Sequence, residues 1–262
     1  MTMDWNEEWN ASIKATSRYQ LNSGSFWDGH ANSNGSSSFS EAMTGDQVAL
    51  IRPDPQQRVL EIGPGNGRLT MPLARSSSEI TIVDPSAMML RAVRTLAESE
   101  GLANLKLINE YWENVDVGAL GMYHKLVSSY SLFMYDVGEQ MRRMSSISDE
   151  VFLFVPADIR IPFDVQEILF GQVAVEHTDY KILSHIAREM GMAPRTLIWE
   201  YPNGPGFDSL EAAVKHCCDM YNATGSIGKK VAEHLSSTMM EKDGRFFANA
   251  SRKVGVICWQ NE

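Results

Sequence analysis

The residues best suited to bind a nucleotide lie in the segment Val59-Leu-Glu-Ile-Gly-Pro-Gly-Asn-Gly-Arg-Leu-Thr70. Its apolar start predicts a buried strand, and the three glycines that follow allow a close backbone approach to a ligand. Dinucleotide-binding turns are written Gly-x-Gly-x-x-Gly and offer amides to a pyrophosphate, whereas the spacing here is Gly-x-Gly-x-Gly. Glu61, two positions before the first glycine, would repel a pyrophosphate but attract an ammonium or sulfonium group.

A second acidic residue follows the next predicted strand. Asp84 stands 21 positions after Gly63, the separation at which a carboxylate binds both hydroxyls of a ribose. Helix-forming residues resume at once, so Ser86 is expected to cap a helix. Met89 then lies one turn into that helix, either over an aromatic ring of a ligand or as an ordinary core methionine.

Three motifs in this order resemble class I, Rossmann-like methyltransferases that use S-adenosylmethionine: Glu61 to Gly67, Asp84, and the helix start Asp84-x-Ser-x-x-Met-Leu90. The resemblance covers roughly residues 56 to 200 and the final strand. It implies S-adenosylmethionine as cofactor and S-adenosylhomocysteine as product. The cofactor-binding residues that it implies are Glu61, Gly63, Pro64, Gly65, Gly67, Asp84, Pro85, Met89, Tyr111, Trp112, Ser129 and Tyr130.

The chain departs from the family pattern after the third strand. Tyr111 stands where many relatives carry an Asp that contacts the adenine amino group, while Trp112 matches through its backbone. After the fourth strand, Ser129 and Tyr130 are expected to flank the methionine moiety. Ser-Ser-Tyr-Ser replaces the Asn-Pro-Pro-Tyr that usually accompanies amino methylation of bases and glutamine. Trp27-Asp-x-x-Ala31 resembles the lead-in of small-molecule methyltransferases, where it folds over the cofactor.

Apolar runs that alternate with helical patterns predict an α/β fold. We expect a seven-stranded, doubly wound, mostly parallel sheet with an antiparallel last strand. The predicted strands are 58–62, 80–83, 105–108, 125–130, 151–155, 196–201 and 253–259. Surface helices are predicted over 86–97 and 180–190. Residues 1–57 are expected to form a helical cap region, followed by a methyltransferase domain over 58–262.

Two insertions lengthen the connections after the fifth and sixth strands, at residues 157–177 and 202–244. The second contains helical patterns near 209–222 and 228–240, with Asp208 and Glu211 as a capping box. Because both follow strand ends on the ligand side of an open sheet, we expect them to meet and form a lid, with a dimer interface as the alternative. An acceptor that must lose a proton needs a base, and the candidates near this pocket are His30, Tyr130, Tyr135, Asp136 and His177. No catalytic residue is assigned.

The acidic composition disfavours nucleic acid as a partner. The 262 residues hold 23 Lys and Arg against 33 Asp and Glu, a net charge of −10, while nucleic-acid binding needs a basic footprint. No apolar run approaches the roughly 20 residues of a membrane span, and the N-terminus lacks a signal-peptide pattern. The interpretation is therefore a cytoplasmic protein, monomer or homodimer, that acts on a small molecule whose methylated atom the sequence does not identify.

The cysteines do not form a disulfide framework, because there are three of them and Cys217 and Cys218 are adjacent. No metal site is assigned. Two alternative functions stay open. One is a regulatory or catalytically silent subunit that binds S-adenosylmethionine without methylating an acceptor. The other is a nicotinamide-dependent oxidoreductase, which Glu61 and the glycine spacing disfavour.

Overall fold

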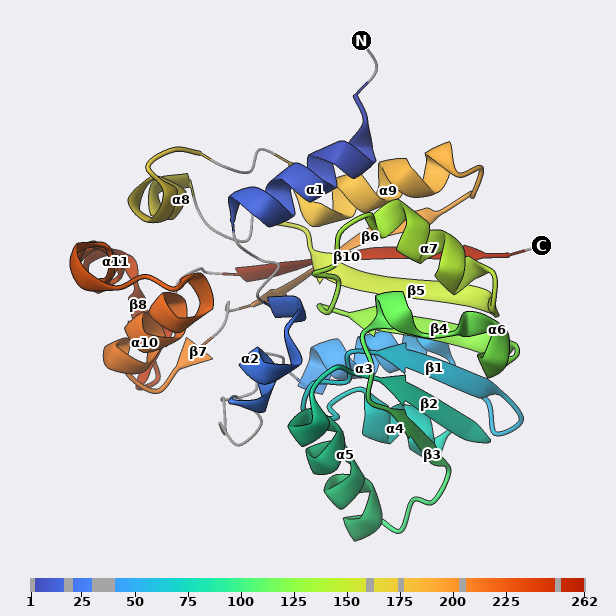
Figure 1. Ribbon diagram of the computed structural model, residues 1–262. Helices are drawn as coiled ribbons and strands as arrows, with labels where there is room; N and C mark the ends of the chain where they lie inside the picture. Colours follow the sequence, from blue (N-terminus) through green and yellow to red (C-terminus); the bar gives the residue numbers. More distant parts are fainter. Residues whose placement is uncertain are drawn as a thin grey trace.

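The centre of the computed structural model is a seven-stranded sheet in the order β3-β2-β1-β4-β5-β10-β6 (Figure 1). The structure describes residues 3–16, 21–29, 41–158, 163–173, 177–202, 206–247 and 251–261. β10 runs antiparallel to both of its neighbours, whereas the other strands are parallel. The predicted sheet with an antiparallel last strand is confirmed. Its strands are β1 (Arg58–Ile62), β2 (Glu79–Val83), β3 (Leu105–Ile108), β4 (Tyr123–Ser129), β5 (Ser148–Pro156), β6 (Arg195–Pro202) and β10 (Ser251–Gln260).

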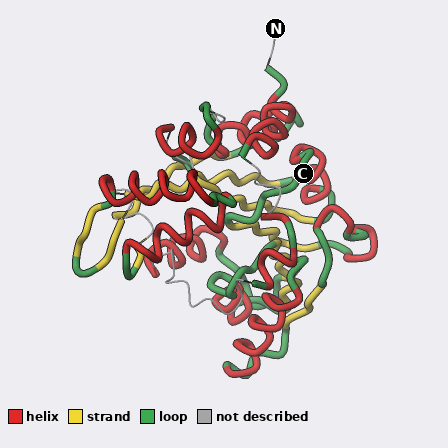
Figure 2. Tube along the Cα trace, turned by 60° about the vertical axis from the view of Figure 1, so that its left-hand side comes forward, coloured by secondary structure: helices red, strands yellow, loops and turns green. Residues whose placement is uncertain are grey.

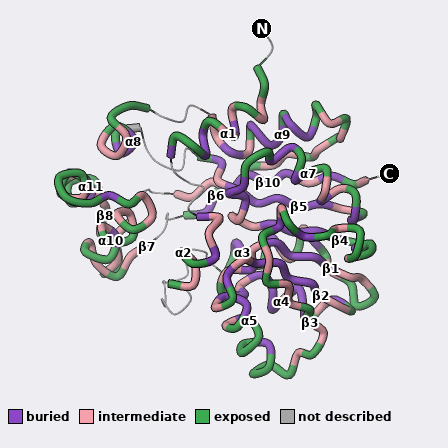
Figure 3. Tube along the Cα trace, viewed as in Figure 1, coloured by how far each residue is buried: buried purple, intermediate pink, exposed green. Residues whose placement is uncertain are grey.

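Helices cover both faces of the sheet, as the turned view of Figure 2 also shows. One apolar core joins the sheet to α1 (Trp5–Ala15), α7 (Val137–Ser145) and α9 (Asp179–Glu189). The other core joins it to α3 (Glu41–Ile51), α4 (Thr70–Arg75) and α5 (Ala87–Ser99). The inner strands β1, β2, β4 and β5 are nearly continuous apolar runs because a parallel sheet is buried on both faces. Figure 3 shows the centre of the sheet as the most continuously buried part of the molecule.

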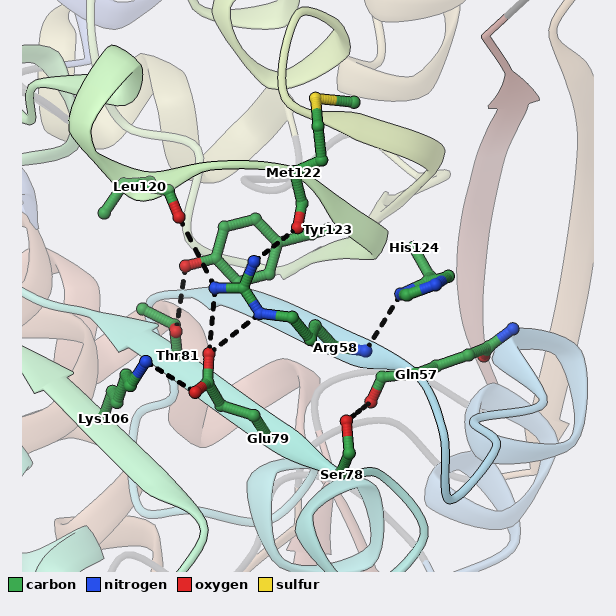
Figure 4. A network of polar contacts seen from close by, with 10 residues as sticks. All are labelled: Gln57, Arg58, Ser78, Glu79, Thr81, Lys106, Leu120, Met122, Tyr123 and His124. Carbon is green, nitrogen blue, oxygen red and sulfur yellow. Dashed lines mark hydrogen bonds and ion pairs between the residues drawn. The ribbon is translucent and has the colours of Figure 1, made fainter.

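A polar network fixes the register of four strands at their amino ends (Figure 4). Arg58 donates to Glu79 Oε1 at 3.0 and 2.9 Å, and Lys106 Nζ lies 2.6 Å from Glu79 Oε2. The pKa of Glu79 is lowered although partial burial opposes the shift, because both cations hydrogen-bond its carboxylate. The Tyr123 hydroxyl donates to Thr81 Oγ1 at 2.9 Å. These contacts align Ile62 with Val83, so the turns that follow β1 and β2 start side by side.

The N-terminal region is tied to the sheet by two separate helices. From α1, Asn6 and Asn10 donate to Asp136 Oδ1 at 3.2 and 2.8 Å, and Trp9 Nε1 donates to the Met134 carbonyl at 2.8 Å. The short helix α2 (Gly24–Asp28) packs instead at the start of α5. Two further short elements, 3₁₀ residues Trp112–Asn114 and α6 (Val117–Leu120), connect β3 to β4.

The two insertions pack against each other beyond the carboxyl ends of the parallel strands (Figure 1). The first contains α8 (Phe163–Phe170), and the second contains α10 (Leu210–Tyr221) and α11 (Gly225–Thr238). Ile168 and Leu169 of α8 pack against a small apolar core made of Ala223, Val231 and Leu235 of the second insertion. His234 Nε2 on α11 lies 3.1 Å from Asp164 Oδ2 on α8. In the described part of the chain, no helix has the length and apolar character needed to cross a membrane.

Two local predictions were wrong, and one small sheet was not predicted. Ser209, and not Asp208, caps α10, because its side chain accepts from the Ala212 amide at 3.0 Å, while Asp208 lies 3.5 Å from Arg245. The fourth strand ends at Ser129 because Tyr130 adopts a left-handed φ of 60°. The second insertion also contains a small antiparallel sheet that was not predicted, in the order β7-β9-β8.

The small sheet consists of β7 (Gly206–Phe207), β8 (Met240–Lys242) and β9 (Arg245–Phe247). Its hairpin turn is Asp243-Gly244, and both residues have positive φ, at 52° and 72°. Asp-Gly is a strong signal for a two-residue hairpin turn of this kind. The turn was therefore visible in the sequence, although the strands beside it are too short and too exposed to show an apolar alternation.

Candidate functional site

The glycine turn between β1 and α4 forms the floor of the candidate site. A Cβ on Gly63 would lie 2.3 Å from the Ser131 Cβ, so only glycine allows the two loops to meet. Ser131 Oγ in turn donates to the Ile62 carbonyl at 2.6 Å. At Gly65, φ is +55° and a Cβ would meet nothing within 4 Å. Gly65 thus presents bare backbone to open space, which is what close contact with a ligand requires.

Glu61 lies directly beneath this turn and is 1% exposed. Thr70 Oγ1, at the start of α4, donates to its Oε2 at 2.6 Å. Burial raises the pKa of Glu61 to about 7, the nearby charge of Asp84 adds to the rise, and the Thr70 bond and Arg68 oppose it. A buried carboxylate with this pKa is stabilised in its charged form by a cation, so the site favours a positively charged ligand.

Asp84 ends the second strand, beside the glycine turn, and is 6% exposed. Its Oδ1 accepts from the Ser86 amide at 2.7 Å. Burial raises the pKa of Asp84 to about 6, and the carboxylate of Asp28 adds to the rise. A carboxylate at this place can accept hydrogen bonds from two neighbouring hydroxyls, as a ribose offers.

The helix start after Asp84 has the predicted cap. Ser86 Oγ accepts from the Met89 amide at 3.0 Å, which confirms Ser86 as the N-cap of α5. Met89 is buried at 6% exposure. The Pro85 carbonyl touches the N-terminal region, since a Cβ on Gly24 would lie 2.3 Å from this oxygen.

Asp28 is a site residue whose role the sequence did not reveal. Its Oδ1 accepts from Ser86 Oγ at 2.6 Å and from the Met88 amide at 3.0 Å, and these two bonds lower its pKa. The only signal was its place in the motif Trp27-Asp-x-x-Ala31. Asp28 thereby connects α2 to the first turn of α5, which follows Asp84. His30 and Ala31 lie outside the described residues.

The loop after β3 presents Tyr111 and buries Trp112. The Tyr111 side chain is 38% exposed, whereas Trp112 is 2% exposed and its carbonyl accepts from Arg143 Nη2 at 3.1 Å. A cavity of about 250 Å³ opens between this loop, the loop after β4 and the residues before α2. Its lining residues are Asn22, Ser23, Tyr111, Phe133, Met134 and Tyr135.

At the end of β4, Ser129 joins a hydrogen-bonded group that includes α3. Its Oγ accepts from Arg68 Nη2 at 3.1 Å and from Gln47 Nε2 at 3.3 Å. Tyr130, the next residue, donates its amide to the Phe154 carbonyl at 2.8 Å. Arg68 and Gln47 were not predicted as site residues, although Arg68 directly follows the last glycine of the turn.

The candidate bases are placed differently from one another. Tyr135 is 41% exposed and lines the cavity. Asp136 binds Asn6 and Asn10 of α1. His177 Nδ1 lies 3.0 Å from Glu8 Oε1, and its ring meets Trp5 edge to face, so the structure gives His177 contacts with α1. For Asp136 and His177 these contacts describe a role in holding α1 in place.

Comparisons with known proteins agree with this geometry. Residues 59–148 match the protein family described as "Methyltransferase domain". The matched segment contains the glycine turn, Asp84, Tyr111, Trp112, Ser129 and Tyr130. The resemblance to methyltransferases that was stated from the sequence is therefore confirmed over this segment, which is about a third of the chain.

Curated relatives are similar to this chain over only part of their own length. Ribosomal RNA small subunit methyltransferase A of Dichelobacter nodosus is 38% identical over 58 residues, which are 22% of this chain and 22% of that protein. The protein of the same name from Magnetococcus marinus is 40% identical over 73 residues, 28% of this chain and 25% of that protein. The chain therefore matches these relatives over about a quarter of their length.

Solved structures extend the likeness of fold beyond that domain. The YcgJ protein from Bacillus subtilis aligns with a TM-score of 0.60 at 14% identity, covering 85% of this chain and 100% of that one. Coclaurine N-methyltransferase, bound to N-methylheliamine and SAH, aligns with a TM-score of 0.53 at 12% identity, covering 94% and 78%. A cyclopropane-fatty-acyl-phospholipid synthase-like protein from Lactobacillus casei gives 0.55 at 16%, covering 82% and 89%.

Proposed function

We propose that the protein transfers a methyl group from S-adenosylmethionine to a small-molecule acceptor and releases S-adenosylhomocysteine. The observation that carries this proposal is the arrangement of two buried carboxylates around an open glycine turn. Glu61 favours positive charge beneath the turn, Asp84 offers acceptors to a ribose, and Gly65 leaves room above its backbone. A pyrophosphate would meet two carboxylates here, so a nicotinamide dinucleotide fits this site poorly.

Each residue of the cofactor set has a task in this proposal. Asp84 holds the ribose, the turn Gly63-Pro64-Gly65 supports the cofactor through its backbone, and Met89 and Trp112 bound the adenine end. Ser129 and Tyr130 stand at the methionine end. Tyr111 extends the adenine side with an aromatic ring in place of the carboxylate that many relatives carry there.

For this reaction the protein must mainly align the cofactor with the acceptor and exclude water from the site. The sulfonium supplies the methyl group as an electrophile, and charge is dispersed as the methyl passes to the acceptor. Holding two reactants in line contributes much of the rate of such reactions. α2 covers the ribose edge, and the insertions stand beyond the strand ends (Figure 1). We propose that these elements form the lid. Tyr135 is the candidate base that faces the cavity.

A small molecule fits this chain better than a nucleic acid. The net charge of −10 opposes the approach of a phosphate backbone. The cavity of about 250 Å³ is smaller than most small-molecule sites, so it leaves room only for a compact group. The rRNA methyltransferases are similar to the chain over only 58 and 73 residues.

Binding of S-adenosylhomocysteine tests the cofactor. It should stabilise the folded protein by about 2.7 kcal/mol at a hundredfold excess over its dissociation constant, and NAD should have no comparable effect. Stabilisation by NAD alone would sink the proposal. Methyl transfer from labelled S-adenosylmethionine to a panel of small amines, phenols, thiols and carboxylic acids then separates an enzyme from a silent binding subunit.

A further inference from the structure

We propose that Asn22, held in one orientation by Glu113, accepts a hydrogen bond from the 6-amino group of the cofactor's adenine. This contact makes the site specific for adenosine over inosine. The inference rests on the proposed function and adds a specificity-determining residue to its cofactor site. Neither residue belongs to the motifs read from the sequence, and the two are 91 positions apart. The fold brings them together beside the cavity at the loop after β3.

The order of the strand ends places the base of the cofactor on the β3 side of the site. Asp84 follows β2, and β2 lies between β1 and β3 in the sheet. The glycine turn after β1 and Ser129 at the end of β4 lie on the other side of Asp84. With the ribose at Asp84 and the methionine end toward β4, the base extends toward the loop after β3. That loop carries Tyr111, which lines the cavity together with Asn22 and Ser23.

The lining of the cavity suits a planar ring with a polar edge. It includes three aromatic side chains and one methionine, which pack well against the faces of such a ring. The amino group of adenine carries two N–H donors, and burying them without acceptors costs free energy. Tyr111 brings no carboxylate to this edge. Ser23 Oγ bonds to Ser25 Oγ of its own segment at 2.8 Å, whereas Asn22 contacts the loop after β3.

Glu113 determines which end of the Asn22 amide can meet a ligand. Asn22 Nδ2 donates to Glu113 Oε1 at 2.7 Å. A carboxylate only accepts hydrogen bonds, so the amide nitrogen must face Glu113 and the amide oxygen must point elsewhere. In the described part of the chain, this oxygen accepts no hydrogen bond. An amide held in this way offers an acceptor, which matches the amino group of adenine and opposes the carbonyl oxygen of hypoxanthine.

The carboxylate of Glu113 is costly where it stands. Its second oxygen, Oε2, is buried and has no hydrogen-bond partner among the residues that the structure describes. A buried acceptor without a donor lowers stability, and a glutamine would keep the shape of the side chain without this cost. A carboxylate at this position is understandable if its task is to accept from Asn22 and prevent the amide from turning over.

Asn22 is held over the site by its own segment. Trp27 Nε1 donates to the Leu21 carbonyl at 2.6 Å, so the segment before α2 closes on α2 itself. Asp28 then fixes α2 to the start of α5 through its two hydrogen bonds, and Figure 1 shows α2 beside that helix. The segment thus bridges the loops after β2 and β3, between which the base of the cofactor is expected.

Two ligands that differ at one edge of the base test this contact in the full chain. S-adenosylhomocysteine presents an amino group there, whereas S-inosylhomocysteine presents a carbonyl oxygen. We expect calorimetry to give the wild type an affinity for S-adenosylhomocysteine that is higher by about tenfold or more. Asn22→Ala should weaken the binding of S-adenosylhomocysteine about three- to tenfold and leave the inosine analogue unchanged, so the ratio of the two affinities falls.

Glu113→Gln separates positioning of the amide from direct contact with the ligand. A glutamine side chain can accept or donate, so Asn22 can turn over and present its amide nitrogen to the inosine analogue. We expect S-adenosylhomocysteine to keep nearly its wild-type affinity while the inosine analogue binds several-fold more tightly. Glu110→Gln is the matched control, because Glu110 lies in the same loop and accepts from the Tyr111 amide and Asn114 Nδ2 at 2.8 and 3.2 Å. It should leave both affinities unchanged.

Three results would overturn the inference: the wild type binds both ligands equally, Asn22→Ala weakens both by the same factor, or Glu110→Gln changes their ratio as Glu113→Gln does. The second result would mean that Asn22 only holds its segment in place. If S-adenosylhomocysteine binds but the ratio does not respond to Asn22, the inference alone fails. If neither ligand binds the wild type, the proposed function fails as well.

Discussion

At the scale of single residues, the site is built around carboxylates that the protein buries at a cost. Glu61 lies near the end of β1 and Asp84 directly follows the neighbouring strand β2. The pKa of each is raised by burial and by a second carboxylate. A residue chosen for stability alone would not be charged at these positions. The cost is understandable if a ligand with positive charge and hydroxyl groups completes the site.

Glu61→Gln should therefore change how stability depends on pH. The pKa of Glu61 is about 7 in the folded protein against a usual 4.5, so the folded state keeps a proton that the unfolded state loses between these values. Stability is complete below pH 4.5 and falls as the pH rises to about 7. The free energy of unfolding of the wild type should be about 3 kcal/mol lower at pH 8 than at pH 4.5 because of Glu61, and this contribution should be absent in the variant. Urea unfolding at the two pH values checks this, and an unchanged difference between them would contradict it.

Asp84→Ala tests the ribose contact. The substitution removes the acceptor of two hydrogen bonds to a charged group, so S-adenosylhomocysteine should bind more weakly by roughly 1.5 to 3 kcal/mol. The fold should survive, because Asp84 ends its strand and its carboxylate otherwise accepts from the Ser86 amide. Calorimetry measures the affinity. An affinity equal to that of the wild type would show that Asp84 does not hold the cofactor.

The sequence predicted these carboxylates because their signal is local: each directly follows or ends an apolar strand at a fixed distance from the glycine turn. It did not predict that Arg68 and Asp28 would lie at the candidate site. Their placement depends on contacts with Ser129 and Ser86, which are 61 and 58 positions away in the sequence. Such contacts become visible only when the topology is known.

At the scale of elements, α2 packs against the start of α5 and is held there by close contacts. Gly24→Ala should displace it, because the new Cβ would lie 2.3 Å from the Pro85 carbonyl oxygen, which belongs to the backbone and cannot move aside cheaply. We expect several-fold weaker binding of S-adenosylhomocysteine and faster hydrogen exchange in residues 21–29. Global stability should change little, because α2 buries only Gly24.

Gly45→Ala is the matched control for this prediction. Gly45 lies inside α3, and a Cβ there would meet nothing within 4 Å. Replacing a helical glycine with alanine should raise stability by up to about 1 kcal/mol and leave exchange in residues 21–29 unchanged. If both variants loosen α2 equally, its close approach to Pro85 does not hold it.

Elements with a strong apolar pattern were predicted well from the sequence. All seven strands of the large sheet were placed: the inner strands are apolar runs that the sheet buries, and the edge strands β3 and β6 are short runs rich in Leu, Ile and aromatic residues although they are less buried. The short helix α2 and the small sheet β7-β9-β8 were not placed. Their residues are mostly half-buried or exposed, and they are held by single contacts such as those of Asp28 and Arg245. Residue types and periodicity carry little information about such elements.

At the scale of the whole molecule, the described chain has three apolar cores of unequal size. The two large cores lie on the faces of the main sheet. The third core, between α8, α10 and α11, has only three fully buried members. Figure 3 shows α10 and α11 as mostly exposed or half-buried. Because buried apolar area supplies most of folding stability, the insertions should be the weakest part of the described structure.

Hydrogen exchange should therefore show two levels of protection. Amides of α8, α10 and α11 should exchange through local opening, while those of β1, β4 and β5 should exchange only through global unfolding. Val231→Ala removes a side chain that is 1% exposed from the small core and should lower protection there by about 2 kcal/mol. It should leave the strands unchanged. Val93→Ala, in the core below α5, should lower the protection of the strands by a similar amount. A single level of protection, shifted equally everywhere by both substitutions, would mean that the insertions fold as one unit with the sheet. A lid that opens separately to admit the acceptor would then be excluded.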